Sequence, residues 1–198
     1  MELPEQLTFR VAGAADAAGV AALHADSWRR NYRGAYSDEY LDGDLNADRL
    51  TVWTARLGAC DPTRHTIVVH EGDTMVGFVH VVLDDDSHWG SLVDNLHVGH
   101  SLKRRGVGTR LMAMAAGAVV AKSASPAMYL WVLEQNAAAR AFYRSRGGVE
   151  VERARVAAPG GLPGRLSGSP AKFRVVWADA TPLSCHEKAA MRSSERAR

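Results

Sequence analysis

The chain has 198 residues, of which 46% are hydrophobic and 23% are charged, which excludes whole-chain disorder, low-complexity fibres and two full-sized domains. Its 24 Lys and Arg and 22 Asp and Glu residues give a formal net charge of +2, which argues against polyanion binding over the whole surface. Cys60 and Cys185 stand far apart with no metal-ligand spacing, so we expect neither a disulfide framework nor a bound metal.

The sequence also predicts where the protein resides. The first residues, MELPEQL, carry two acids and no apolar run, unlike a signal peptide. The longest uncharged apolar stretch, 111–121, is shorter than the roughly 20 residues that cross a bilayer. Two scattered thiols fit a reducing compartment. We therefore expect a cytoplasmic protein that does not enter membranes.

Hydrophobic periodicity and turn residues predict an alternation of strands and helices. Strands are expected at 7–11, 65–70, 74–83, 89–98, 127–133, 149–153 and 172–177. Helices are expected at 14–30, 37–41, 46–57 (with Gly58 just past the end), 106–122 and 136–145. An acidic turn at 84–87 and a Gly- and Pro-rich loop at 157–170 separate some of them. The order predicts an α/β fold with a mixed sheet and helices on both faces, over 1–179, and a flexible tail over 180–198.

A basic, glycine-containing segment opens the helix expected at 106–122. It reads Lys103-Arg104-Arg105-Gly106-Val107-Gly108-Thr109. Backbone N–H groups at a helix start have no partners within the helix, and the helix dipole adds positive potential there. Since glycine lets a phosphate approach the backbone closely, the segment predicts an anion site suited to a pyrophosphate. A solvated basic loop is the alternative, and no complete dinucleotide or Walker A fingerprint is present.

A second polar constellation follows the buried strand at 127–133. Asn136 and Tyr143 are about two helical turns apart, so they share a helix face with Arg140. The Asn136 amide can both donate and accept hydrogen bonds, and Tyr143 offers a phenolic proton. The alternative is a helix N-cap at Asn136 and a packing aromatic at Tyr143.

These two segments, in this order, resemble the GNAT N-acetyltransferase superfamily. The pattern Lys103-x-x-Gly106-x-Gly108 resembles its acetyl-coenzyme A signature, with Lys in the first place, and Asn136-x-x-Ala139-x-x-Phe142-Tyr143 matches its later motif. The sequence departs from the family at His100, where Pro is frequent, and at Gly147-Gly148, where Gly-Phe is usual. The resemblance implies a mostly antiparallel sheet with splayed central parallel strands. It also implies an N-acetyltransferase that moves an acetyl group from acetyl-CoA to a primary amine by direct transfer in a ternary complex.

The resemblance assigns a co-substrate, acetyl-CoA, and no metal. It implies that the pantetheine arm pairs with the strand residues Leu96, His97 and Val98. It places the pyrophosphate at the helix start formed by Lys103, Arg104, Arg105, Gly106, Val107, Gly108 and Thr109, with Asn136 and Ala139 also on the cofactor. Tyr143 is then the acid that protonates the departing thiolate.

The amine side of the reaction is less constrained by the sequence. An amine must lose a proton before it attacks, and Asp94 is the first candidate base, ahead of His97, His24 or a water chain. Strand alternation puts Asp94 and His97 on opposite faces unless a bulge intervenes. Trp28, Tyr32 and Tyr36 are expected to line the acceptor pocket, or else to pack a helix on the sheet.

The identity of the acceptor stays open. Small-molecule amines and protein amines are both expected partners, dimers are frequent in the resembling family, and no nucleic acid is expected. The competing interpretation is a binding module that senses acyl-CoA and catalyses nothing. A weaker third one is a nucleic-acid binder that uses Lys103–Arg105 and the basic tail.

Overall fold

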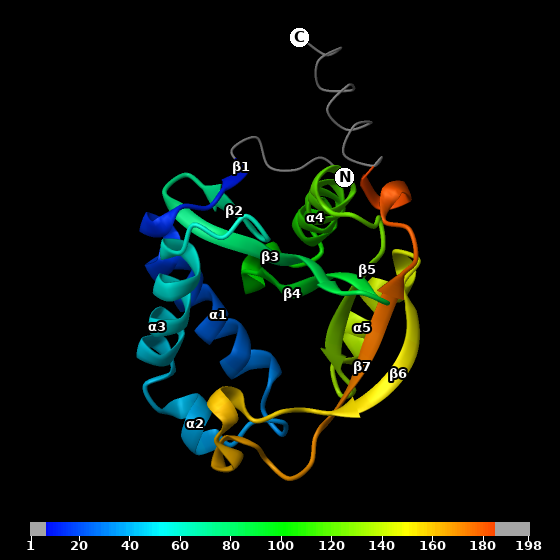
Figure 1. Cartoon of the computed structure of the whole chain (residues 1–198). Coiled ribbons are helices and arrows are strands. Elements are labelled where there is room, and N and C mark those ends of the chain that lie inside the picture. The colour runs from blue at the N-terminus through cyan, green and yellow to red at the C-terminus, as the bar shows by residue number, and fades with distance from the viewer. Residues whose placement is uncertain (1–6, 185–198) are drawn as a thin grey trace. The chain divides into compact units, whose positions relative to one another are not determined.

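The computed structural model describes residues 7–184, which fall into two compact units (Figure 1). Of the described residues, 7–11, 61–130 and 176–184 form the first unit, and 12–60 and 131–175 form the second. Each unit therefore combines segments that are distant in the sequence, and each is described by itself.

Most strands of the first unit form an antiparallel meander. β1 (Leu7–Val11), β2 (Arg64–Glu71), β3 (Thr74–Asp86) and β4 (Gly90–Val98) pair in chain order. β5 (Met128–Leu133) begins parallel to β4, with Ser91 opposite Met128 and Leu92 opposite Tyr129. With β6 (Val149–Arg155) and β7 (Ala171–Trp177), the strand order is β1-β2-β3-β4-β5-β7-β6. The mixed, mostly antiparallel sheet expected from the sequence is thus confirmed.

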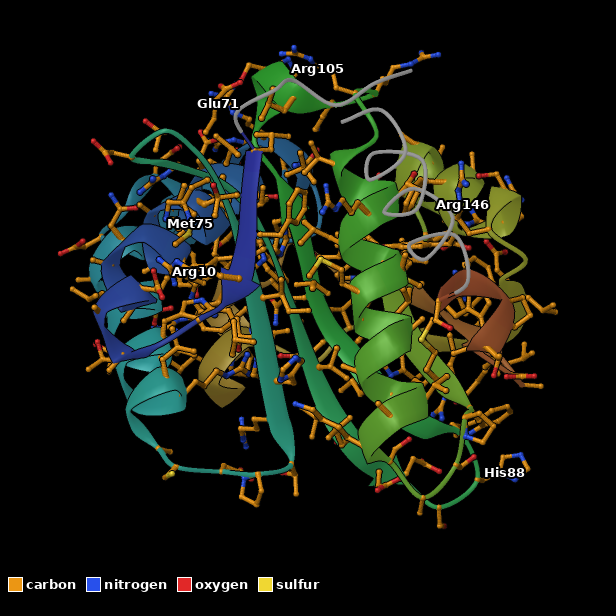
Figure 2. The ribbon with its side chains drawn as sticks, turned by 90° about the horizontal axis from the view of Figure 1, so that it is seen from above. Arg10, Glu71, Met75, His88, Arg105 and Arg146 are labelled. Atoms are coloured by element: carbon orange, nitrogen blue, oxygen red, sulfur yellow. The ribbon has the colours of Figure 1, made fainter. Side chains whose placement is uncertain are left out.

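Helix α4 (Val107–Lys122) covers one face of the meander (Figure 2). The helix is rich in alanine, and Leu111, Ala115 and Val119 on its inner side are fully buried. The approach is close at Gly77 of β3, where an added Cβ would lie 2.8 Å from Val69 Cγ1 and 3.2 Å from Leu111 Cδ1. Glycine at this position therefore allows α4 to pack closely against β3.

The second unit contains the remaining helices. α1 (Ala17–Asn31) follows a short 3-10 turn, η1 (Ala14–Asp16), and packs side by side with α3 (Leu45–Gly58), as Figure 1 shows. α2 (Asp38–Asp42) lies between them in the chain, and α5 (Ala137–Ser145) follows β5. The buried residues that form the core here are Ala25, Trp28, Ala35, Tyr36, Leu41, Leu45 and Leu133.

The structure contains every strand and helix expected from the sequence, with differences at their limits. Gly58 is the last residue of α3 rather than the first beyond it. The acidic turn expected at 84–87 is wrong for Asp84–Asp86, which continue β3. The loop at 157–170 contains two 3-10 turns, η3 (Pro159–Gly161) and η4 (Pro163–Arg165).

The expected tail begins in an ordered part of the first unit. Ala180 is fully buried, and its N–H donates to the carbonyl of Pro126 at 2.9 Å. Residues 180–184 of the segment expected to be flexible are described, and 185–198 lie outside the described residues.

Candidate active site

The first part of the site is the start of α4. After β4 the chain makes a 3-10 turn, η2 (His100–Leu102), and reaches the helix N-cap Gly106, whose φ of 85° lies in the left-handed region. Arg104 also has a positive φ, of 65°. The N–H of Arg110 donates to the carbonyl of Gly106 at 3.0 Å, so Val107, Gly108 and Thr109 provide the N–H groups that precede the helical ladder. The first N–H groups of a helix point out of its N-terminal end, where they can donate hydrogen bonds to an anion.

Three cations stand directly before these N–H groups. The side chains of Lys103, Arg104 and Arg105 are all exposed. Figure 2 shows Arg105 toward the same end of the first unit as Glu71 in the β2–β3 hairpin, and His88 at the opposite end. The positive charges therefore concentrate at one end, where the dipole of α4 adds to them. The helix start predicted from the sequence is formed, and its chemistry fits a pyrophosphate.

The second part of the site is a β-bulge in β4. Val93 pairs with Val81 of β3 and Asn95 pairs with His80, so Asp94 is an extra residue in the strand. A bulge shifts the alternation of side chains by one position. The regular alternation between Asp94 and His97 is therefore interrupted, and the Asp94 carboxylate acts electrostatically on the His97 imidazole. The Asn95 amide nitrogen donates to the exposed Asp94 carboxylate at 2.6 Å.

His97 is electrostatically coupled to its surroundings. Burial lowers its pKa to about 4, against the opposing effect of the Asp94 carboxylate, and the Lys103 ammonium lowers it further. The imidazole is consequently neutral at pH 7. The sequence placed Asp94 and His97 on opposite faces unless a bulge intervened, and the structure contains such a bulge at Asp94.

Beyond the bulge, β4 is paired on one side. Leu96, His97 and Val98 pair with residues of β3. Within residues 7–184, the pairing of β4 with β5 joins only Ser91 and Leu92 to their partners. An extended ligand could therefore add to the other edge of Leu96–Val98 as a further strand.

Helix α5, in the second unit, carries a further group of residues that the sequence predicted to be functional. Asn136 caps this helix, because its Oδ1 accepts from the N–H of Ala139 at 3.1 Å. Tyr143 is 8% exposed, and burial raises the pKa of its phenol to about 12. Arg140 has a structural function: it forms a two-pronged ion pair with Glu150 at 2.8 Å and stacks on Phe173. Asn136 is thus the helix N-cap, as the alternative interpretation expected, and the roles of Asn136 and Tyr143 toward a co-substrate stay predictions.

The aromatic residues expected to bind the acceptor form one cluster. The ring of Trp28 lies 5.4 Å from Tyr32 and 5.0 Å from Tyr36, and the series continues to Tyr40, 6.2 Å from Tyr36. Trp28 and Tyr36 are each 8% exposed, so they also serve the core. Arg49 already lies over the Trp28 ring at 4.4 Å. Tyr32 and Tyr40 are partly buried and form the accessible rim of the cluster.

The histidine proposed on α1 is engaged in the interior. The indole N–H of Trp53 donates to Nδ1 of His24 at 2.9 Å, and both side chains are buried. In this tautomer the proton of the imidazole sits on Nε2. To act as a base, Nδ1 would have to give up a buried hydrogen bond, so the structure disfavours His24 as the base.

Sequence reasoning missed a polar network centred on Asp48 of α3. Its carboxylate accepts from Tyr40 Oη at 2.8 Å, from Arg49 Nη2 at 2.5 Å and from Arg165 Nη1 at 3.0 Å. Asp48 and Arg165 are 117 positions apart, and no local spacing signals such a pair. Tyr40 could have been found, because Trp28, Tyr32, Tyr36 and Tyr40 recur every four residues.

Two searches of the described part of the chain were negative. No cluster of three or more His, Cys, Asp or Glu side chains in residues 7–184 could hold a metal ion. None of the helices in that range is long and apolar enough to cross a membrane.

Comparisons with known proteins agree with this geometry. The model of the acetyltransferase (GNAT) family matches residues 21–147. The probable N-acetyltransferase Rv2775 of Mycobacterium tuberculosis is 28% identical over 150 residues, which cover 72% of this chain and 80% of that protein.

Solved structures show the same fold. A GCN5-related N-acetyltransferase from Rhodopseudomonas palustris has a TM-score of 0.66 at 22% identity, covering 89% of this chain and 97% of that one. YncA, a putative acetyltransferase from Salmonella typhimurium solved with acetyl-CoA, has a TM-score of 0.62 at 18% identity, covering 88% and 95%. With the family match spanning more than half of its residues, the chain belongs to the acetyltransferase (GNAT) family.

Proposed function

We propose that this GNAT acetyltransferase moves the acetyl group of acetyl-CoA onto a primary amine by direct transfer within a ternary complex. The observation that carries the proposal is the start of α4, where a left-handed glycine and three exposed cations precede N–H groups outside the helical ladder. The structural relative YncA was solved with acetyl-CoA.

Binding of the co-substrate would use both strand and helix. Lys103–Arg105 and the N–H groups at Gly106, Val107, Gly108 and Thr109 would hold the phosphates, because helix dipole and side chains act in the same sense. Leu96, His97 and Val98 would pair with the pantetheine amides along the edge of β4. On α5, the Asn136 cap leaves Nδ2 as a donor, and Ala139 keeps the adjoining surface small.

Acetyl-CoA supplies an activated acyl group and a thiolate leaving group. Tyr143 would donate its phenolic proton to that thiolate. Its pKa of about 12 keeps the phenol protonated at neutral pH, so the proton is available when the sulfur becomes basic. A buried hydroxyl is also held in a narrow range of positions, which favours transfer to one atom.

The attacking amine has to reach the site unprotonated or lose a proton there. An alkylamine has a pKa of roughly 10, so a base is needed at pH 7. We assign this task to Asp94, which the bulge exposes and Asn95 orients at 2.6 Å. His97, which is neutral at pH 7, is the alternative acceptor of the proton.

Trp28, Tyr32 and Tyr36 would form the acceptor pocket. The partly buried Tyr32 offers a ring face for an alkyl amine, and the two buried rings support it. A small-molecule amine and a protein amine both fit this chemistry, and a homodimer is compatible with it. The cytoplasmic location stays a prediction.

A screen of amines with detection of thiol release from acetyl-CoA tests the proposal. We expect release that depends on one class of amine, with a mass increase of one acetyl group on that amine. Saturable binding of coenzyme A without release for any amine would support the sensor module instead. Nucleic-acid binding that coenzyme A does not displace would support the third interpretation. A stable acetyl group on the exposed Cys60 would contradict direct transfer.

A further inference from the structure

We propose that Arg165 and Asp48 form a clamp that fixes the loop between β6 and β7 onto the helices of the second unit and thereby positions the aromatic cluster for the acceptor. The identity of the ligand rests on the proposed function. The clamp itself rests on contacts within the second unit. Arg165 and Asp48 are positioning residues, because they act on the acceptor through other side chains.

The clamp is a partly buried ion pair. Arg165 Nη1 donates to Asp48 Oδ1 at 3.0 Å, with side-chain exposures of 25% and 22%. The guanidinium also lies 4.5 Å over the ring of Tyr40, whose hydroxyl donates to the other oxygen of the same carboxylate at 2.8 Å. Asp48 therefore ties the loop to the rim of the aromatic cluster through a charge pair, a hydrogen bond and a stacked ring.

Backbone contacts show that the loop lies flat on this surface. The N–H of Ser37 donates to the carbonyl of Arg165 at 3.0 Å, and the Ser37 hydroxyl donates to the carbonyl of Gly164 at 2.9 Å. The N–H of Ser167 donates to the carbonyl of Ala35 at 2.9 Å. These three bonds bracket Tyr36, so the ring position depends on the loop being in place.

Apolar contacts complete the connection. Leu166 forms an isolated bridge with Tyr36 and packs on the cluster together with Val156. Most of the other loop residues are exposed, and the loop is rich in glycine and proline, so it would order poorly without an anchor. Arg165 is the charged residue in the loop that reaches α3, so we infer that it supplies this anchor.

Charge removal that preserves side-chain size tests the clamp. Asp48→Asn and Arg165→Met should each raise the KM for the amine on the order of tenfold, because a displaced ring misplaces the acceptor. The KM for acetyl-CoA should stay within about twofold. Arg165→Lys, which keeps a charge within reach of Asp48, should recover part of the loss. Arg153→Met, which breaks the exposed 2.7 Å pair with Glu134 in the same unit, is the matched control and should change neither constant.

A second measurement does not depend on activity. Hydrogen exchange at the Ser167 amide should accelerate at least about tenfold in Asp48→Asn, and trypsin should cut after Arg165 faster than in the wild type. Unchanged exchange and cleavage would overturn the clamp. Faster exchange with an unchanged KM for the amine would overturn its role in positioning the acceptor.

The two proposals fail in different ways. A wild-type chain that binds acetyl-CoA but acetylates no amine would overturn the proposed function, while exchange at Ser167 would still decide whether Asp48 clamps the loop. Thermal unfolding of each variant identifies a global loss of structure. If Asp48→Asn or Arg165→Met is unfolded, the KM for the amine and the exchange at Ser167 in Arg165→Lys decide whether the clamp exists.

Discussion

The indole N–H of Trp53 and Nδ1 of His24 form a hydrogen bond of 2.9 Å in the interior of the second unit. The bond joins α1 to α3, which pack against each other, and α1 also contains Trp28 of the aromatic cluster. His24 could in principle act as a base, but here it has a structural role. Its Nδ1 accepts a buried hydrogen bond, and breaking that bond would cost free energy.

Replacing Trp53 by Phe keeps the ring and removes the donor. We expect a loss of about 1–3 kcal/mol in the free energy of unfolding, because Nδ1 of His24 stays buried without this hydrogen bond. Urea unfolding measures it. Trp89→Phe, the same change at a half-buried position in the first unit, should cost less. A fully stable Trp53→Phe chain would show that His24 exchanges partners easily.

Replacing Tyr143 by Phe removes only the phenolic oxygen. We expect kcat to fall roughly 10²–10⁴-fold, the usual contribution of a general acid, while the affinity for coenzyme A measured by calorimetry changes little. The matched control is Tyr129→Phe, whose hydroxyl donates to Asp85 at 2.5 Å in a structural contact. An unchanged rate would remove Tyr143 from the chemical step.

Replacing Asp94 by Asn tests the assignment of the base. The amide keeps the shape but cannot take a proton, so kcat/KM at pH 7 should fall on the order of 10²-fold. Activity should rise again toward pH 10, where more of the amine is already neutral. Asp73→Asn in the β2–β3 turn is the control. If His97→Gln loses the rate and Asp94→Asn does not, the base is His97.

The depressed pKa of His97 makes a prediction about stability. In the unfolded chain this group titrates near 6.5, whereas in the folded chain its pKa is about 4. The unfolded state therefore binds more protons between these values, and His97 destabilises the folded state as the pH falls from 7 to 5, by about 2 kcal/mol. Urea unfolding at both pH values should show this loss in the wild type and a smaller one in His97→Gln. Equal losses would contradict the depressed pKa.

Replacing Gly106 by Ala tests the anion site. A φ of 85° costs a side chain about 1 kcal/mol, and the added methyl group stands where phosphate would approach the backbone. The KM for acetyl-CoA should rise on the order of tenfold, with a smaller effect on kcat. Gly72→Ala at a φ of 57° in the β2–β3 turn imposes similar strain and should leave the KM unchanged. Equal effects of the two variants would indicate strain alone.

The sequence was sufficient for local structure, including the helix start proposed to bind phosphates. Strands and helices follow from patterns that span a few residues, such as β-branched runs and the Asn136 cap, and the family resemblance is confirmed by the match over 21–147. The start of α4 was predictable for the same reason, because its glycine, its cations and its N–H groups are neighbours in the chain.

What the sequence could not decide are relationships between distant residues. The bulge at Asp94 depends on how β4 registers against β3, and periodicity alone predicted the opposite face for His97. The burial that sets the pKa of His97 and Tyr143 is likewise a property of packing. Asp48 meets Arg165 across 117 positions only because the loop folds back onto α3.

The sequence by itself therefore determined the fold class and the family, because both rest on short-range patterns, and it predicted which residues would meet a pyrophosphate. The tertiary structure alone determined where the alternation of β4 is interrupted, which histidine is engaged in the interior and which loop contacts hold the aromatic cluster. The sequence specifies which side chains are present. Their pKa values also depend on the distances between charges and on burial, which only the packing of the folded chain sets.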